Sequence, residues 1–99
     1  MSGHVFHPGH EELHGVTVVV EGASGRTWVG RYQETSERGV LLHDVAIHDP
    51  ATAALPRETW IERLRKFGIR VDEPRVILPR KEAGPITRLT DWNEPSSGA

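Results

Sequence analysis

The residues best suited to chemistry are histidines gathered near the start of the chain. Four of the six histidines fall within the first 14 of 99 residues, as His4, His7, His10 and His14. Imidazole is the commonest side-chain metal ligand near neutral pH, so this density predicts a divalent-metal site. Pro8 and Gly9 interrupt a helix through all four, and only the last two histidines can share a helical face. A solvated arm that binds no metal is the other interpretation.

The remaining histidines each precede an aspartate, as His43-Asp44 and His48-Asp49. A carboxylate beside an imidazole can serve a hydrolase or a metal site. Neighbouring residues of a strand point to opposite faces, so the first pair cannot act on one substrate without a bulge. The second pair falls in a connector, where Asp49 is equally suited to capping a helical turn. We expect Asp49 to cap and His43 and His48 to be polar strand-end residues, and we assign no catalytic residue.

Positive charges are concentrated in the second half of the chain. That half holds nine of the twelve lysines and arginines, with acidic residues interleaved among them. Four of these cations lie in the region of the last expected strands and are candidate nucleic-acid contacts: Arg75, Arg80, Lys81 and Arg88. The formal net charge of −2 does not favour broad binding to a phosphate backbone. RNA is therefore a candidate partner, and a protein-assembly role is at least as well supported.

The composition and motifs exclude several functional classes. The chain has no cysteine, which removes disulfides, thiol catalysis and cysteine-ligated metal clusters. It contains no phosphate-binding Gly-rich loop, nucleophile elbow or His-Glu-x-x-His pair. Apolar runs such as residues 18–20 are far shorter than the roughly 20 residues of a membrane helix, and no signal-peptide core follows Met1. We expect a cytoplasmic, non-enzymatic protein with no cofactor beyond a divalent metal and no membrane contact.

Residues 16–48 are the segment around which the chain is organised, because they read as three strands joined by glycine-bearing turns. Strands are expected at residues 16–21, 26–35 and 40–47, with turns at residues 22–25 and 36–39. In the first, Val18 and Val20 face away from Val19; in the second, Trp28 and Tyr32 flank Gly30 on one face. A glycine in mid-strand predicts a sharp bend or the close approach of another backbone. In the third, Val45 and Ile47 are expected opposite Val40 and Leu42, with a register slip near Ala46.

A helix is expected over residues 57–67, inserted before the last strands. Its apolar stripe is formed by Trp60, Ile61, Leu64 and Phe67. Gly68 supplies a left-handed cap, and the basic last turn suits the helix dipole. In a barrel this helix would lie over an opening.

The rest of the chain predicts short β segments and polar ends. A short strand is expected at residues 69–72, an edge strand at residues 75–79 that Pro79 ends, a turn at Gly84-Pro85 and a final strand at residues 86–92. The domain organisation follows: a histidine-rich arm over residues 1–15, one domain over residues 16–92 and a polar tail of disordered composition over residues 93–99.

The run from Gly25 to Tyr32, GRTWVGRY, followed after about seven residues by VLLHDV at residues 40–45, resembles the first conserved motif of the Sm-like (LSm) family. The resemblance covers residues 16–48. It implies a small, strongly bent, five-stranded SH3-like barrel behind an N-terminal helix. Members of that family assemble into rings in which the last two strands of neighbouring subunits pair, and many bind RNA.

This chain departs from the family pattern at the residues associated with RNA. Ser36 and Gly39 stand where uridine-binding members carry aspartate and asparagine, and Arg80-Lys81 is the nearest counterpart of a second-motif Arg-Gly pair. We therefore expect a mainly β, Sm-like module that forms a homo-oligomer, a ring being one form, with RNA as a candidate ligand. The alternative is a metal-binding or metal-sensing protein that uses the N-terminal histidines.

Overall fold

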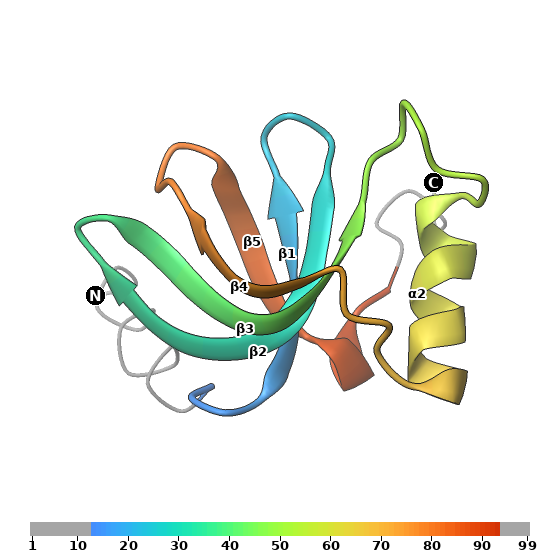
Figure 1. Ribbon diagram of the computed structural model, residues 1–99, viewed down its shortest axis with the longest axis horizontal. Helices are drawn as coiled ribbons and strands as arrows, with labels where there is room; N and C mark the ends of the chain where they lie inside the picture. The colour runs from blue at the N-terminus through green and yellow to red at the C-terminus, as the bar shows by residue number, and fades with distance from the viewer. Residues whose placement is uncertain (1–12, 94–99) are drawn as a thin grey trace.

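A computed structural model describes residues 13–93. Within them the chain forms five strands, one α-helix and one short 3-10 helix (Figure 1). These are β1 (Thr17–Gly22), β2 (Thr27–Ser36), β3 (Gly39–His48), α2 (Arg57–Phe67), β4 (Glu73–Leu78), β5 (Ala83–Arg88) and η1 (Leu89–Asp91). Most of the expected histidine arm and nearly all of the polar tail lie outside the described residues. Within the described residues, no helix combines the length and apolar character needed to cross a membrane.

The strands form one antiparallel sheet in the order β4-β3-β2-β1-β5. The expectation of a mainly β fold with five strands and one inserted helix is confirmed. Both edges contribute to the same apolar cluster, since Leu78 of β4 and Ile86 of β5 both pack there. A sheet whose opposite edges meet one cluster has to bend around it, and Figure 1 shows β2 and β3 curving strongly. The sheet is open, because no ladder joins β4 to β5 in residues 13–93.

The bend is made where Gly30 of β2 meets a bulge in β3. A Cβ atom at position 30 would lie 2.9 Å from the carbonyl oxygen of His43, so only glycine allows this approach. The register skips there: Arg31 pairs with His43 and Val29 with Ala46. Asp44 is the bulged residue, with φ of 54° in the left-handed region. The predicted close backbone approach at Gly30 is confirmed.

The bulge reverses the faces of the second half of β3. Val45 joins Val40 and Leu42 in one cluster, and Ile47 packs against it, whereas Ala46 belongs to the opposite face. The expected alternation for residues 45–47 was wrong, because the extra residue is at Asp44 and not near Ala46.

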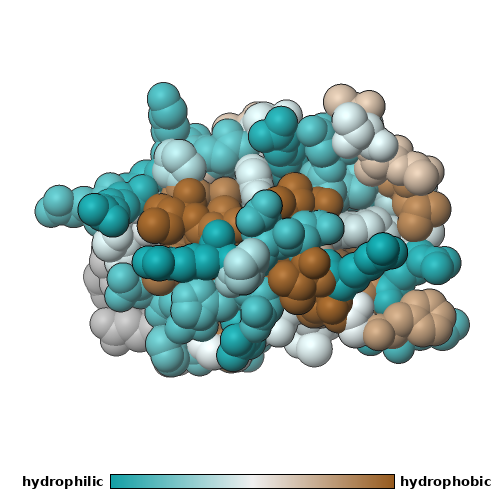
Figure 2. All heavy atoms as spheres, in the orientation of Figure 1, coloured by the Kyte–Doolittle hydropathy of each residue, from teal (hydrophilic) through white to brown (hydrophobic). Residues whose placement is uncertain are grey.

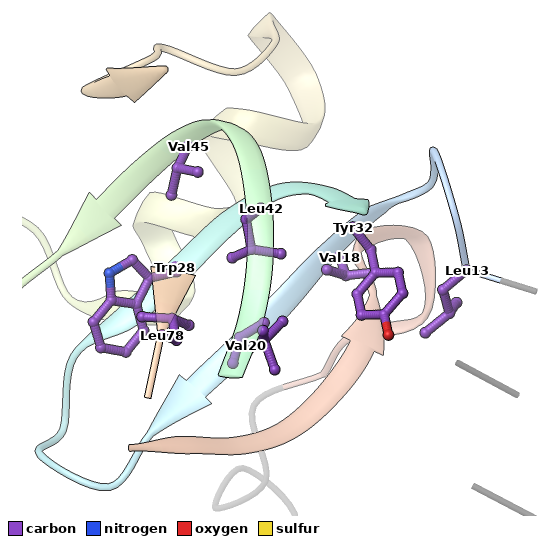
Figure 3. Packing of buried hydrophobic residues seen from close by; sticks show 9 residues of the cluster. Leu13, Val18, Val20, Trp28, Tyr32, Leu42, Val45 and Leu78 are labelled. Carbon is purple, nitrogen blue, oxygen red and sulfur yellow. The ribbon is translucent and has the colours of Figure 1, made fainter. Parts of the chain in front are cut away.

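Two apolar layers stabilise the sheet, one on each face. The inner layer lies within the bend and is shown in Figure 3, where the labelled side chains converge from several strands. Its buried members are Leu13, Val18, Val20, Trp28, Tyr32, Val40, Leu42, Val45 and Leu78. The outer layer joins Val19, Val29, Ala46, Ile61, Leu64 and Trp92. Each large side chain buried in either layer contributes roughly 1.5–3 kcal/mol.

Helix α2 has the predicted bounds, and its apolar stripe explains how it packs. Ile61 and Leu64 are buried in the outer layer, and Trp60 packs against it. The helix therefore covers the outer face of the sheet. The expectation that it lies over a barrel opening was wrong. Gly68 ends it with φ of 97° and donates its N–H to the carbonyl of Leu64 at 2.9 Å. Phe67, expected in the stripe, is 71% exposed.

The segment after the helix differs from the expectation of a strand at residues 69–72. It is irregular, and it is joined to β3 through one residue. The backbone N–H of Asp72 donates to the carbonyl of Val45 at 2.7 Å, and its carboxylate accepts from the N–H of Ile47 at 2.8 Å. β4 then begins at Glu73, two residues earlier than predicted, and it ends before Pro79 on an edge of the sheet, as predicted.

The chain end also differs from the expected strand over residues 86–92. β5 already contains Gly84 and Pro85, where a turn had been expected, and it ends at Arg88. Leu89–Asp91 then forms a 3-10 turn that places Trp92, 3% exposed, in the outer layer. The Nε1–H of Trp92 donates to Glu21 at 3.1 Å. Burial of this large ring stabilises the 3-10 turn more than extra strand pairing would stabilise a longer β5.

Candidate functional site

The strongest candidate site is formed by the two edges of the sheet. Within residues 13–93, β4 pairs only with β3, and β5 pairs only with β1. The outward N–H and C=O groups of each edge therefore have no strand partner in the described chain. Such an edge is a template on which another strand can add.

Prolines restrict how much of each edge can pair. Pro74 near the start of β4 and Pro85 within β5 have no N–H to donate. This leaves residues 75–78 and 86–88 as the uninterrupted pairing stretches. On β4, Val76 and Leu78 belong to the inner layer, so the alternate Ile77 points away from it and is 39% exposed. An exposed apolar residue on an open edge is suited to contact with another strand.

The four candidate nucleic-acid cations lie on the two edge strands and in the turn that joins them. Arg75 lies on β4 opposite His43, and Arg88 lies on β5 opposite Val18, so these two residues occupy opposite edges of the sheet. Arg80 and Lys81 lie in the turn between the two strands. Arg88 is six residues along β5 from that turn, or about 20 Å at the usual rise per residue. RNA binding through these four residues stays a prediction from the sequence.

Of the four candidate metal ligands, His14 alone falls in the described residues. It is exposed, and its Nδ1 lies 2.8 Å from the carbonyl oxygen of Gln33. A carbonyl only accepts, so Nδ1 is the donor in this hydrogen bond. His4, His7 and His10 lie outside the described residues. Within residues 13–93, no group of three or more His, Asp or Glu side chains is placed to hold a metal.

Three residues of the two His-Asp pairs make side-chain contacts within the fold. Asp44 forms an ion pair with Arg31 at 2.5 Å across the bulge, and Asp49 pairs with Arg26 at 3.2 Å. His48 is 5% exposed, donates from Nε2 to the carbonyl of Leu55 at 2.7 Å and packs with its ring centroid 5.2 Å from that of Trp60. His48 therefore holds the connector between β3 and α2 against the sheet.

Asp49 also caps the turn that follows β3, as its sequence position predicted. Its carboxylate accepts the N–H of Ala51 at 2.9 Å, and its carbonyl accepts the N–H groups of Thr52 and Ala53. The hydrogen bond from Ala51, helped by the Arg26 guanidinium and opposed by desolvation, lowers the pKa of Asp49 below its usual value of 3.8. The charged form is thus favoured in the folded protein.

No protein-family model matches the chain, and no curated protein sequence shows significant similarity to it. The assignment of a site therefore depends on the chain's own residues.

One surface feature was missed by sequence reasoning. A groove beside the C-terminal half of α2 has an apolar floor that includes Trp60 and Phe67, with Arg63 and Arg70 at its rim. The sequence placed Phe67 in the buried stripe because it lies seven residues after Trp60. Gly68 could have indicated that Phe67 is exposed. Because the helix ends at residue 67, its last side chain lies beyond the part of the sheet that the earlier helical turns cover.

Proposed function

We propose that this chain is a non-enzymatic, Sm-like assembly module that forms a homo-oligomer through the edges of its sheet. The observation that carries the proposal is that β4 and β5, the last two strands, are the two free edges of one bent sheet. In the family that the chain resembles, the last two strands are the ones that pair between subunits. The Gly30 bend and the strand count agree with the same family.

The geometry favours a closed, head-to-tail arrangement. β4 of one subunit would pair with β5 of the next, so each subunit uses each edge once. The available stretches are short, at residues 75–78 and 86–88, and such an interface also has to cover apolar side chains. Ile77 supplies one on β4. A small domain with thin cores gains stability from such burial between subunits.

A charge placed on the β4 edge tests the proposal. We expect Ile77→Lys to shift the oligomer toward monomer, because a lysine on an edge strand opposes strand addition. Ile77 is 39% exposed, so the substitution leaves the core intact. Val71→Lys is the matched control, since Val71 is 47% exposed and lies outside the strands. Sedimentation equilibrium at several concentrations measures both variants; equal association of Ile77→Lys and wild type would overturn the edge interface.

A second candidate function is divalent-metal binding at His4, His7, His10 and His14. The observation that favours it is the hydrogen bond between Nδ1 of His14 and the carbonyl of Gln33, at 2.8 Å. Metal-binding imidazoles are commonly held in this way, with the second nitrogen left for the metal. Isothermal titration with Zn²⁺ and Ni²⁺ tests it. Stoichiometric binding that is lost when the four histidines are replaced by alanine supports the site, whereas unchanged binding excludes it.

A further inference from the structure

The groove beside α2 lies apart from the two sheet edges. Its volume is about 580 Å³, within the range of small-molecule ligand pockets. Leu55 comes from the connector before the helix, Trp60, Leu64 and Phe67 from the helix, and Arg70 from the loop after it. Three consecutive segments of the chain thus form one concave surface.

The groove gathers much of the apolar surface that the fold leaves exposed. Four large apolar side chains are exposed in residues 13–93, and two of them, Phe67 at 71% and Leu55 at 37%, line the groove. A third, Val71 at 47%, follows the rim residue Arg70. Figure 2 shows apolar residues on the side of the molecule occupied by α2 and the connector, with hydrophilic residues between them. Apolar exposure concentrated at a concave surface indicates an interaction site.

Arg63 and Arg70 line the groove, and Lys66 lies beside the Phe67 ring. The guanidinium of Arg63 and the ammonium of Lys66 lie 5.7 and 5.8 Å from the centroid of the Phe67 ring. In residues 13–93, no carboxylate lies within ion-pair distance of these two residues or of Arg70. Arg65 on the same helix differs, since it pairs with Glu62 at 2.8 Å. Within the described residues, the groove thus combines an apolar floor with two arginines that form no ion pair.

We propose that this groove binds a short acidic segment of a partner protein, with an apolar side chain seated between Trp60 and Phe67 and carboxylates at Arg63 and Arg70. Charge complementarity selects the acidic residues, and the apolar floor selects the side chain between them. A nucleic acid fits less well, because its phosphates would find only the rim and the chain carries a net charge of −2. The inference goes beyond oligomerisation and does not depend on it, because α2 and its flanking loops contribute no sheet edge.

An unbiased peptide selection tests the ligand class. The full chain is used to select from a displayed library of random twelve-residue peptides, and enriched sequences are resynthesised with a fluorescent label for anisotropy at 50 mM and 300 mM NaCl. We expect enrichment of peptides that combine Asp or Glu with Leu, Phe or Trp, and at least tenfold weaker binding at the higher salt. No enrichment, or enrichment of basic peptides, would overturn the proposal.

Variants locate the binding surface. Phe67→Ala should weaken binding of the selected peptide at least tenfold, and Arg63→Glu with Arg70→Glu should abolish it. Arg38→Glu, an exposed arginine in the β2–β3 turn, should bind like wild type. Equal binding by all variants would refute the site, as would preferential binding of a labelled uridine dodecamer over every selected peptide. A change of oligomeric state on Phe67→Ala would instead assign the groove to a second copy and also refute the proposal.

Discussion

Gly30 is the residue on which the curvature of the sheet depends. A Cβ atom there would lie 2.9 Å from the carbonyl oxygen of His43 and 3.0 Å from Cγ2 of Val45. Both neighbours belong to the bulged part of β3, whose backbone cannot retreat without breaking the pairing around Asp44. The sequence predicted this contact, because glycine is otherwise disfavoured in mid-strand.

We expect Gly30→Ala to lower the free energy of unfolding by about 1–3 kcal/mol, the usual cost of forcing extra atoms into a packed site. Urea unfolding followed by tryptophan fluorescence measures the change. Glu34→Ala on the same strand is the control, since Glu34 is exposed. Wild-type stability in Gly30→Ala would show that the backbones approach less closely than described.

Asp49 makes a contribution to stability that depends on pH. Its pKa in the folded protein is lowered below 3.8 by the hydrogen bond from Ala51 and by Arg26. The folded state thus favours the ionised carboxylate, so the stabilisation is fully present above pH 3.8 and is lost as the pH falls through the folded-state pKa. Asp49→Asn keeps an acceptor for the Ala51 N–H but removes the charge.

We therefore expect Asp49→Asn to be less stable than wild type at pH 7, and the difference to shrink toward zero as the pH falls below 3.8. Thermal unfolding followed by circular dichroism across pH 2–7 tests this. Glu37→Gln, an exposed carboxylate in the β2–β3 turn, is the control for general charge effects. A difference that stays constant with pH would contradict the assigned role of the charge.

At the scale of elements, Arg65 of α2 hydrogen-bonds the segment that follows β5. Arg65 donates from Nε to the carbonyl of Leu89 at 2.9 Å and also hydrogen-bonds the carbonyl of Trp92. Trp92 in turn contacts Glu21 of β1, and the Arg57 guanidinium lies 5.4 Å from the Trp92 ring. The 3-10 turn, the helix and β1 are thus coupled around one buried aromatic ring.

Replacing Arg65 by methionine keeps the aliphatic stem and removes the donors. We expect Arg65→Met to lower the free energy of unfolding by about 1–3 kcal/mol, because two carbonyls lose charged hydrogen bonds. Amide exchange over residues 89–92 should accelerate, which hydrogen–deuterium exchange mass spectrometry resolves. Arg63→Met on the exposed face of the same helix should leave that exchange unchanged. Equal protection in both variants would mean that burial of Trp92 alone holds the segment.

Elements governed by local signals were predicted well. The bounds of α2 followed from the 3.6-residue spacing of Ile61 and Leu64 and from Gly68, and the faces of β1 followed from the alternation of its valines. The bulge at Asp44 was misplaced because it depends on Gly30 in another strand. The burial of Trp92 was not predicted because it depends on contacts with both β1 and α2, which the local sequence pattern does not indicate.

The candidate site was predicted in part. Pro79 marked β4 as an edge, but the four candidate cations were grouped by closeness in sequence, and the strand order then placed Arg75 and Arg88 on opposite edges. The α2 groove combines residues at helical spacing with residues from a connector and a loop, which follow no common spacing. Such a surface becomes visible only when the segments are folded together.

For the whole molecule, the central claim is that the two open edges of the bent sheet assemble copies of the chain. Light scattering on the unmodified protein, after size-exclusion chromatography, measures this most directly. We expect one species whose mass is two or more whole multiples of 11.0 kDa and stays constant on dilution. A mass of 11.0 kDa at every concentration would contradict it, and the free edges would then belong to a monomer.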